Sequence, residues 1–130
     1  MDKCADQFNR VIKELCEDLA RAYPSDDFFN FAGALLATYN SLSPCTCIEK
    51  FYTRVNISYG DKILSKNEDF FINHDYKDEI SRKPFLDKII SRLQNYWKEM
   101  VADDKETVIK YMSTLIKLAK KYHDIKENTK

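Results

Sequence analysis

Glycine and proline are scarce in this chain of 130 residues, which holds two glycines and three prolines. Tight turns and hairpins depend on these residues, so their scarcity favours a few long helices over a strand-rich fold. Gly33 and Gly60 lie far apart in the sequence, so the chain has no glycine-rich loop that could cradle a phosphate group. It also lacks the G-x-S-x-G elbow of hydrolases and the H-E-x-x-H pair of zinc proteases, which removes the common sequence routes to catalysis.

Long apolar runs are missing too. No run approaches the roughly 18–20 residues that a membrane-spanning helix needs. The N-terminal residues M-D-K-C-A-D-Q-F are charged and lack the apolar core of a signal peptide. We therefore expect an intracellular protein with no membrane span. In that setting the four cysteines are expected to be reduced thiols rather than a disulfide framework.

The residues that are present describe an ordinary globular chain, with 44% hydrophobic and 32% charged side chains. The length predicts one domain over residues 1–130. The formal net charge is zero but unevenly placed: residues 1–80 hold nine Lys/Arg and fourteen Asp/Glu, and residues 81–130 hold twelve and seven. Such asymmetry favours oriented association with a partner or with a second copy.

Hydrophobic periodicity predicts an all-α, single-domain bundle of about five helices. The strongest signal spans residues 84–122, where apolar residues at spacings of three and four predict a C-terminal helical hairpin that carries the only tryptophan, Trp97. We expect Trp97 to be buried and the hairpin to be a principal packing surface. The last residues, Ile125–Lys130, are expected to fray.

Three further helices are predicted before the hairpin, over residues 2–22, 28–42 and 44–65. The second is apolar on nearly all sides, which is typical of a helix in the middle of a bundle. The third begins at the Ser43-Pro44 start signal, and a bend is allowed at Gly60. Residues 67–83 break the pattern and predict an irregular connection with one short helical turn.

Two groups of residues are weak candidates for a metal or thiol site. Cys45 and Cys47 lie in the expected first turn of a helix, where the helix dipole lowers the pKa of a thiol. His74 lies in an acidic stretch that could hold a hard cation or serve in general acid–base catalysis. A zinc site that combines the two cysteines with a histidine is a further possibility. Plain packed thiols and a solvated polar loop are the alternative interpretations, and we expect neither a bound metal nor a cofactor.

Four lysines on the last predicted helix suggest a rival function. They form an arginine-free stripe opposite the apolar face, as expected for contact with a nucleic-acid backbone, or for the solvated back of a helix. Glu106 is spaced to pair with one of them, which favours the solvated interpretation. The residues of this lysine stripe are Lys110, Lys117, Lys120 and Lys121.

Several segments resemble one family of viral proteins. They are Y-P-S-D-D, S-P-C-T-C-I-E-K-F, D-K-I-L-S-K-N-E-D-F-F-I-N-H-D-Y, L-Q-N-Y-W-K-E-M and K-E-T-V-I-K-Y-M-S-T-L-I-K-L. Together they are similar to small helical proteins of nucleocytoplasmic large DNA viruses, the giant viruses. The chain departs from that pattern at Tyr23-Pro24, where the family has Phe-Pro, and at residues 108–111, where it lacks a second tryptophan. The resemblance implies a viral setting, in the host cytoplasm or the virion, and no catalytic residues.

The aromatic residues, the charge asymmetry and the missing motifs lead to one preferred function: a non-enzymatic interaction or structural protein. The expected partner-binding residues are Phe70, Phe71 and Tyr76, because adjacent rings in a polar connector cannot share one helical face. The alternative interpretation of Phe70 and Phe71 is that both rings are buried between helices. Self-association of the chain is also expected. Nucleic-acid binding through the lysine stripe is the runner-up function. A small metal- or thiol-dependent enzyme or regulator comes third.

Overall fold

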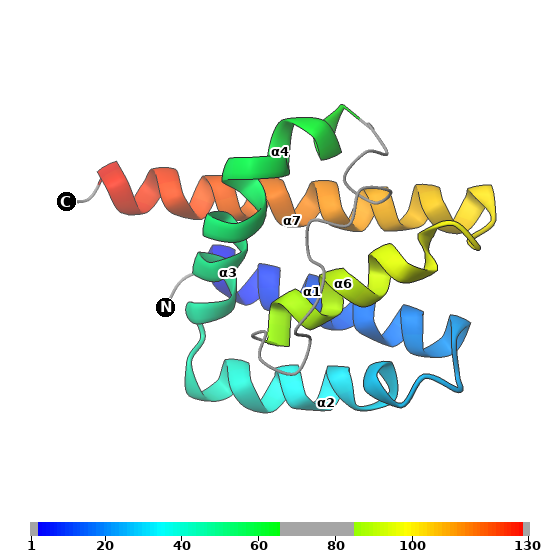
Figure 1. The fold of residues 1–130 in the computed structure, drawn as a ribbon. Coiled ribbons are helices and arrows are strands. Elements are labelled where there is room, and N and C mark those ends of the chain that lie inside the picture. The colour runs from blue at the N-terminus through cyan, green and yellow to red at the C-terminus, as the bar shows by residue number, and fades with distance from the viewer. Residues whose placement is uncertain (1–2, 66–84, 129–130) are drawn as a thin grey trace.

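The computed structural model describes residues 3–65 and 85–128, which form a helical bundle with no strand (Figure 1). The predicted all-α bundle is therefore confirmed. None of the helices in these ranges combines the length and the apolar character needed to cross a bilayer. The elements are α1 (Lys3–Ala22), α2 (Asp27–Leu42), α3 (Thr46–Phe51), the π-helical turn η1 (Tyr52–Asn56), α4 (Ile57–Leu64), α6 (Phe85–Trp97) and α7 (Ala102–Asn128).

Helix α1 lies between α2 and α7, and these two pairs form the closest helix packings (Figure 1). Its apolar residues recur every three or four positions, so they fall on one face and enter the core together. Fully burying a residue such as Phe8 or Leu15 contributes about 1.5–3 kcal/mol. Helix α7 also buries one face in the core, and the residues of this face are Val108, Met112, Leu115, Ile116, Ala119 and Tyr122.

Trp97 is 1% exposed, which confirms that it belongs to the core. It ends α6, and the turn that follows is closed by a 3.2 Å hydrogen bond from the Met100 N–H to the Trp97 carbonyl. The Lys105 ammonium lies 5.4 Å from the centre of the indole ring. The two arms of the predicted hairpin are thus α6, which contacts α3, and α7, which packs most closely on α1.

The prediction that the chain frays from Ile125 is wrong over the described residues, because α7 continues to Asn128. The physical reason is a tie to α3. The Glu49 carboxylate accepts hydrogen bonds from the Tyr122 hydroxyl at 2.7 Å and from the Lys126 ammonium at 2.6 Å. These bonds hold the last turns of α7 against the start of the α3–α4 segment.

The third predicted helix exists, but it begins later than predicted, and its departure from regular α-helix is not at Gly60. Ser43 closes α2 by donating its N–H to the Tyr39 carbonyl, and α3 begins at Thr46 without a side-chain cap from Cys45. The helical path then continues to Leu64, with the irregularity in η1 rather than at Gly60. There the Ile57 N–H bonds to the carbonyl five residues back, which is the π-helical pattern.

The prediction that places residues 28–42 in the middle of the bundle is also wrong. Helix α2 lies at the edge, at the bottom of Figure 1. One face packs on α1 through Phe29, Ala32, Gly33 and Leu36, and the opposite face is exposed. Among the described elements, α1 is the one that packs extensively on α2.

Candidate functional site

The partner-binding residues expected from the sequence, Phe70, Phe71 and Tyr76, lie outside the described residues, as does His74. The interface at the three aromatic residues therefore remains a prediction. So does the set of Cys45 and Cys47 with His74 as metal ligands. Among the residues in the two described ranges, no three potential ligands of the His, Cys, Asp or Glu type come together.

The burial of Cys16 and Cys47 agrees with the interpretation of the cysteines as packed thiols. Cys47 is buried, and this burial raises the pKa of its thiol to about 12, although the charge of Lys50 acts in the opposite direction. Burial likewise raises the pKa of Cys16 to about 12, with Cys47 and Glu17 adding to the effect. Desolvation therefore outweighs the helix dipole at Cys47.

The lysine stripe is exposed along α7, as predicted. Lys120 pairs with Asp124 at 3.0 Å, and Lys110 lies 3.8 Å from Glu106. Both pairs join residues four apart on the same helix. Neighbouring carboxylates therefore offset part of the positive charge that a phosphate backbone would require.

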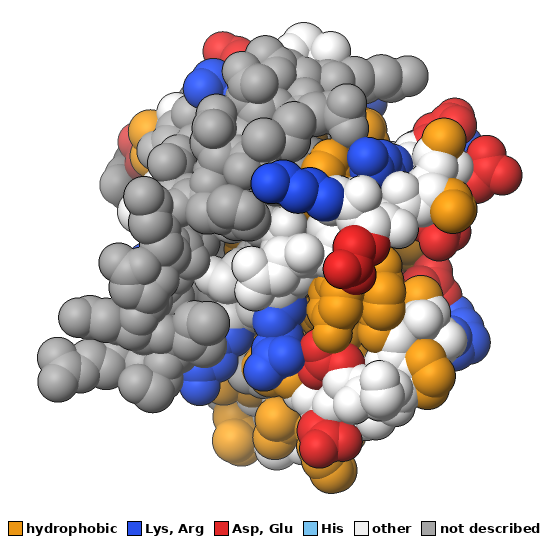
Figure 2. Space-filling model, turned by 45° about the vertical axis from the view of Figure 1, so that its right-hand side comes forward, with side chains coloured by type: hydrophobic (Ala, Val, Ile, Leu, Met, Phe, Trp, Pro, Cys, Tyr) orange, Lys and Arg blue, Asp and Glu red, His pale blue; other side chains and the backbone are white. Residues whose placement is uncertain are grey.

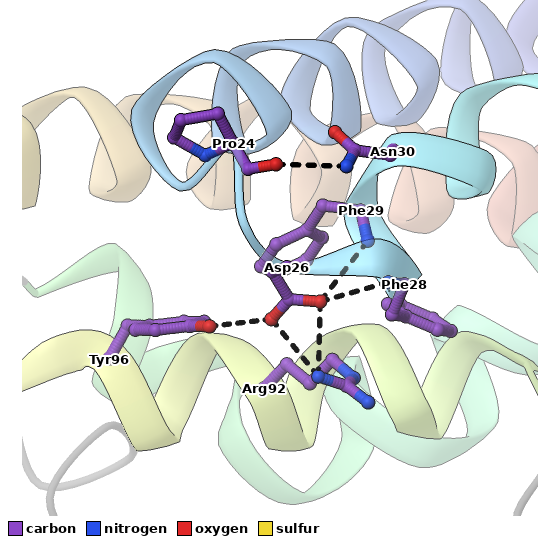
Figure 3. Close-up of polar contacts among 7 residues, drawn as sticks. All are labelled: Pro24, Asp26, Phe28, Phe29, Asn30, Arg92 and Tyr96. Carbon is purple, nitrogen blue, oxygen red and sulfur yellow. Dashed lines mark hydrogen bonds and ion pairs between the residues drawn. The ribbon is translucent and has the colours of Figure 1, made fainter.

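Asp26 is the centre of the best-connected polar cluster in the described chain (Figure 3). Its buried carboxylate caps α2 by accepting bonds from the backbone N–H groups of Phe28, at 2.9 Å, and Phe29, at 3.4 Å. From α6, the Arg92 guanidinium reaches both carboxylate oxygens at 3.1 and 3.0 Å, and the Tyr96 hydroxyl donates at 2.5 Å. The cluster joins the start of α2 to α6.

Aromatic rings surround this junction. The Tyr23 and Tyr96 rings stack with centroids 3.9 Å apart, and the Arg92 guanidinium carbon lies 4.8 Å from the centre of the Phe28 ring. Burial acts to raise the pKa of Asp26, but the Tyr96 bond, the Arg92 charge and the two N–H bonds outweigh it and lower the pKa. The bond to Asp26 in turn raises the pKa of Tyr96 to about 12.

The Asp26 junction acts as a structural tie. An acid–base catalyst must exchange a proton with a substrate, whereas this carboxylate is fixed as an ion by four groups that donate to it. Arg92 and Tyr96 were not among the residues that the sequence marked as candidates. The available signal was their spacing of four residues, which places both on one face of α6.

A second polar cluster lies where α3 and η1 meet the end of α7. The Glu49 carboxylate lies beside a hollow of about 310 Å³, which the stacked rings of Tyr52 and His123, 4.0 Å apart, also line. The bonds from Lys126 and Tyr122 lower the pKa of Glu49 despite the opposing effect of burial. Burial and the bond to Glu49 raise the pKa of Tyr122. This cluster, too, holds its carboxylate between donors.

The most unusual surface is the outer face of α2. Four large apolar side chains remain exposed there, at 64% for Phe31, 53% for Leu35, 43% for Tyr39 and 80% for Leu42. Figure 2 is turned about the vertical axis from the view of Figure 1, so α2 lies along the lower edge in both. Hydrophobic side chains reach the surface along that edge in Figure 2. We call these four residues the α2 face.

No charged residue occurs between Phe28 and Ile48, although charged residues make up 32% of the chain. The α2 face is therefore apolar along its length, and no lysine or glutamate from its own helix interrupts it. This charge-free run is the feature of the sequence that marks the exposed α2 face. The same run predicts a buried helix, because an apolar helix in a bundle is usually covered on all sides.

No protein-family model, curated protein or solved structure matches the chain. The resemblance to giant-virus proteins therefore stays a prediction, and the function must be argued from the surface itself.

Proposed function

We propose that this chain is a non-enzymatic interaction or structural protein that binds a protein partner through the α2 face. The observation that carries this proposal is the exposure of four large apolar residues on a helix without charged residues after Asp27. Isolated exposed apolar residues are normal on protein surfaces, whereas a contiguous apolar patch marks a binding site. In the viral setting that the resemblance implies, the protein would be a virion component or an adaptor.

The chemistry of the polar clusters supports binding rather than catalysis. Asp26 and Glu49 are each held as carboxylates by several donors, and each ties two helices together. The buried thiols of Cys16 and Cys47 have a raised pKa, so at neutral pH they remain protonated and poor nucleophiles. The α2 face has no such internal role.

Affinity capture with quantitative mass spectrometry, from cells in which the protein is made, tests the proposal. Leu35→Lys places a charge in the centre of the α2 face, and Val101→Lys is the matched control because Val101 is 64% exposed outside that face. We expect Leu35→Lys to reduce recovery of the partner at least tenfold and Val101→Lys to leave it unchanged. Equal recovery with both variants would remove the α2 face from the proposal.

The same capture also tests the other predicted surfaces. A partner lost only on changing Phe70, Phe71 or Tyr76 one at a time, with the melting temperature unchanged, would place the interface at those residues. For the nucleic-acid alternative, Lys110, Lys117 and Lys121 are changed to glutamine. Nucleic-acid binding with a log–log salt slope of about −0.9 per phosphate contact, flattened by that triple change, would favour the lysine stripe.

A further inference from the structure

We propose that the partner of the α2 face is a second copy of this chain, bound through an antiparallel pairing of the two α2 helices about a twofold axis. This inference rests on the proposed function, since it names the occupant of the same surface. Three features of α2 carry it: the spacing of its exposed residues, the match between large and small residues in one orientation, and the absence of charge.

The spacing is that of a helix-pairing seam. Phe31, Leu35, Thr38 and Leu42 are exposed and follow one another at intervals of four, three and four residues. Apolar residues at alternating intervals of three and four form a seam along which two helices pack side by side. Thr38 is the one polar member of this seam, and its methyl group still offers an apolar contact.

The antiparallel orientation gives complementary neighbours. With the axis midway between Leu35 and Thr38, Leu35 faces Thr38 of the second copy and Phe31 faces Leu42. A small residue is thus set against a large one at the centre of the seam, where the methyl group of Thr38 contacts Leu35. A parallel pairing would instead set Thr38 against Thr38 and Phe31 against Phe31. A twofold axis makes every such contact occur twice, as in most homodimers.

The absence of charge favours a second copy over other occupants. A helix that lies on a membrane usually carries Lys or Arg along its polar margins, and α2 has neither. A strongly charged partner would find no opposite charge on this face. Two identical faces without charge meet with no like-charge repulsion. Their pairing covers the apolar residues of both copies at the same time.

The exposed area indicates a weak dimer. If a large side chain offers on the order of 150–200 Å², the exposed fractions of the α2 face amount to about 400 Å² per copy. The adjoining exposed residues, such as Ala34 and Thr38, bring the total buried in a dimer to about 1,000 Å², the lower bound for a specific interface. We therefore expect reversible association with a Kd on the order of 100 µM.

Sedimentation equilibrium of the full chain between about 10 µM and 1 mM tests the dimer, because this range brackets that Kd. We expect the average mass to rise toward twice the chain mass, and Leu35→Lys to weaken association at least tenfold. The matched control, Val101→Lys, should associate like the unchanged protein. Circular dichroism and thermal melting of each variant confirm that it is folded. Association that Leu35→Lys leaves unchanged would overturn the proposal.

Charge-pair rescue tests the orientation. Phe31→Lys and Leu42→Glu should each be monomeric alone, and a mixture of the two should associate because the antiparallel pairing brings these positions together. A mixture of Phe31→Lys with Phe31→Glu should stay monomeric, since those positions lie roughly 16 Å apart along the paired helices. Rescue in the second mixture but not in the first would overturn the antiparallel arrangement.

The failure of this inference is distinguishable from failure of the proposed function. A chain that stays monomeric to 1 mM, while Leu35→Lys still abolishes capture of a different protein, overturns the dimer and leaves the α2 face as a binding surface. A monomer that co-sediments with phosphatidylcholine vesicles through Leu35 overturns both, because the occupant is then a lipid surface. A dimer that loses association with Leu35→Lys supports both.

Discussion

Replacing Asp26 should reveal how much of the fold depends on the junction between α2 and α6. Asp26→Ala removes the cap of α2 and leaves the Arg92 guanidinium and the Tyr96 hydroxyl without the acceptor that they share. Asp26→Asn is the gentler change, because an asparagine oxygen still caps a helix but carries no charge. The two variants together separate the capping contribution from the charge contribution.

The magnitudes follow from the contacts. The cap is worth about 1 kcal/mol, and hydrogen bonds to a charged group are worth about 1.5–3 kcal/mol each. The ion pair lies at the low end because the Arg92 side chain is 37% exposed and water screens it. We expect Asp26→Ala to cost about 4–5 kcal/mol and Asp26→Asn about half as much. A domain of this size has only about 7–20 kcal/mol of stability in total.

The assay is urea unfolding followed by circular dichroism at several pH values. Since the pKa of Asp26 is lowered in the folded protein, the folded state keeps the carboxylate charged at pH values where the unfolded chain, with a pKa near 3.9, binds a proton. The stabilisation is therefore complete above about pH 5 and is lost as the pH falls through the folded pKa. The difference between the unchanged protein and Asp26→Asn should be constant from pH 7 to about pH 5 and shrink below about pH 4.

Asp27→Asn is the matched control, because Asp27 is an exposed acid in the first turn of the same helix. Loss of its favourable interaction with the helix dipole should cost well under 1 kcal/mol. Equal costs for Asp26→Asn and Asp27→Asn would show that the junction adds nothing beyond the dipole. A cost for Asp26→Asn that does not vary with pH would contradict the electrostatic account.

Three further outcomes are expected. Trp97→Ala should cost about 3–5 kcal/mol and lower the melting temperature by many degrees, since the indole is 1% exposed; an unchanged melt would remove it from the core. At pH 8, mass spectrometry after brief alkylation should find Cys16 and Cys47 unmodified until urea unfolds the chain, because burial raises the pKa of both thiols to about 12. Glu49→Gln should speed amide hydrogen exchange over residues 122–128 while leaving α1 protected, and unchanged exchange there would show that Glu49 does not hold the end of α7.

Helix identity was predictable because it depends on local spacing. The apolar residues of α1 recur every three or four positions, and this pattern alone places its buried face. The same reasoning predicted the burial of Trp97. Helix starts were less predictable, since a serine before a proline serves equally well to close one helix or to open the next. Here Ser43 closes α2.

The candidate surface was less predictable because it depends on which helices cover which faces. The sequence of α2 shows how much apolar surface it carries but not that only one side meets α1. The Asp26 junction joins residues 66 and 70 positions apart, and no local pattern connects them. Both features follow from tertiary packing, which a single sequence does not contain.

The π-helical turn η1 has a consequence for the evolution of this chain. An α-helix turns by about 100° per residue, and a π-helical turn accommodates the equivalent of one extra residue. The segments α3, η1 and α4 all contact α7, and α3 contacts α1 and α6 as well. A homologue that had lost one residue between Tyr52 and Asn56 would turn a different side of α4 toward α7, so its apolar and polar positions from residue 57 onward would have to change together.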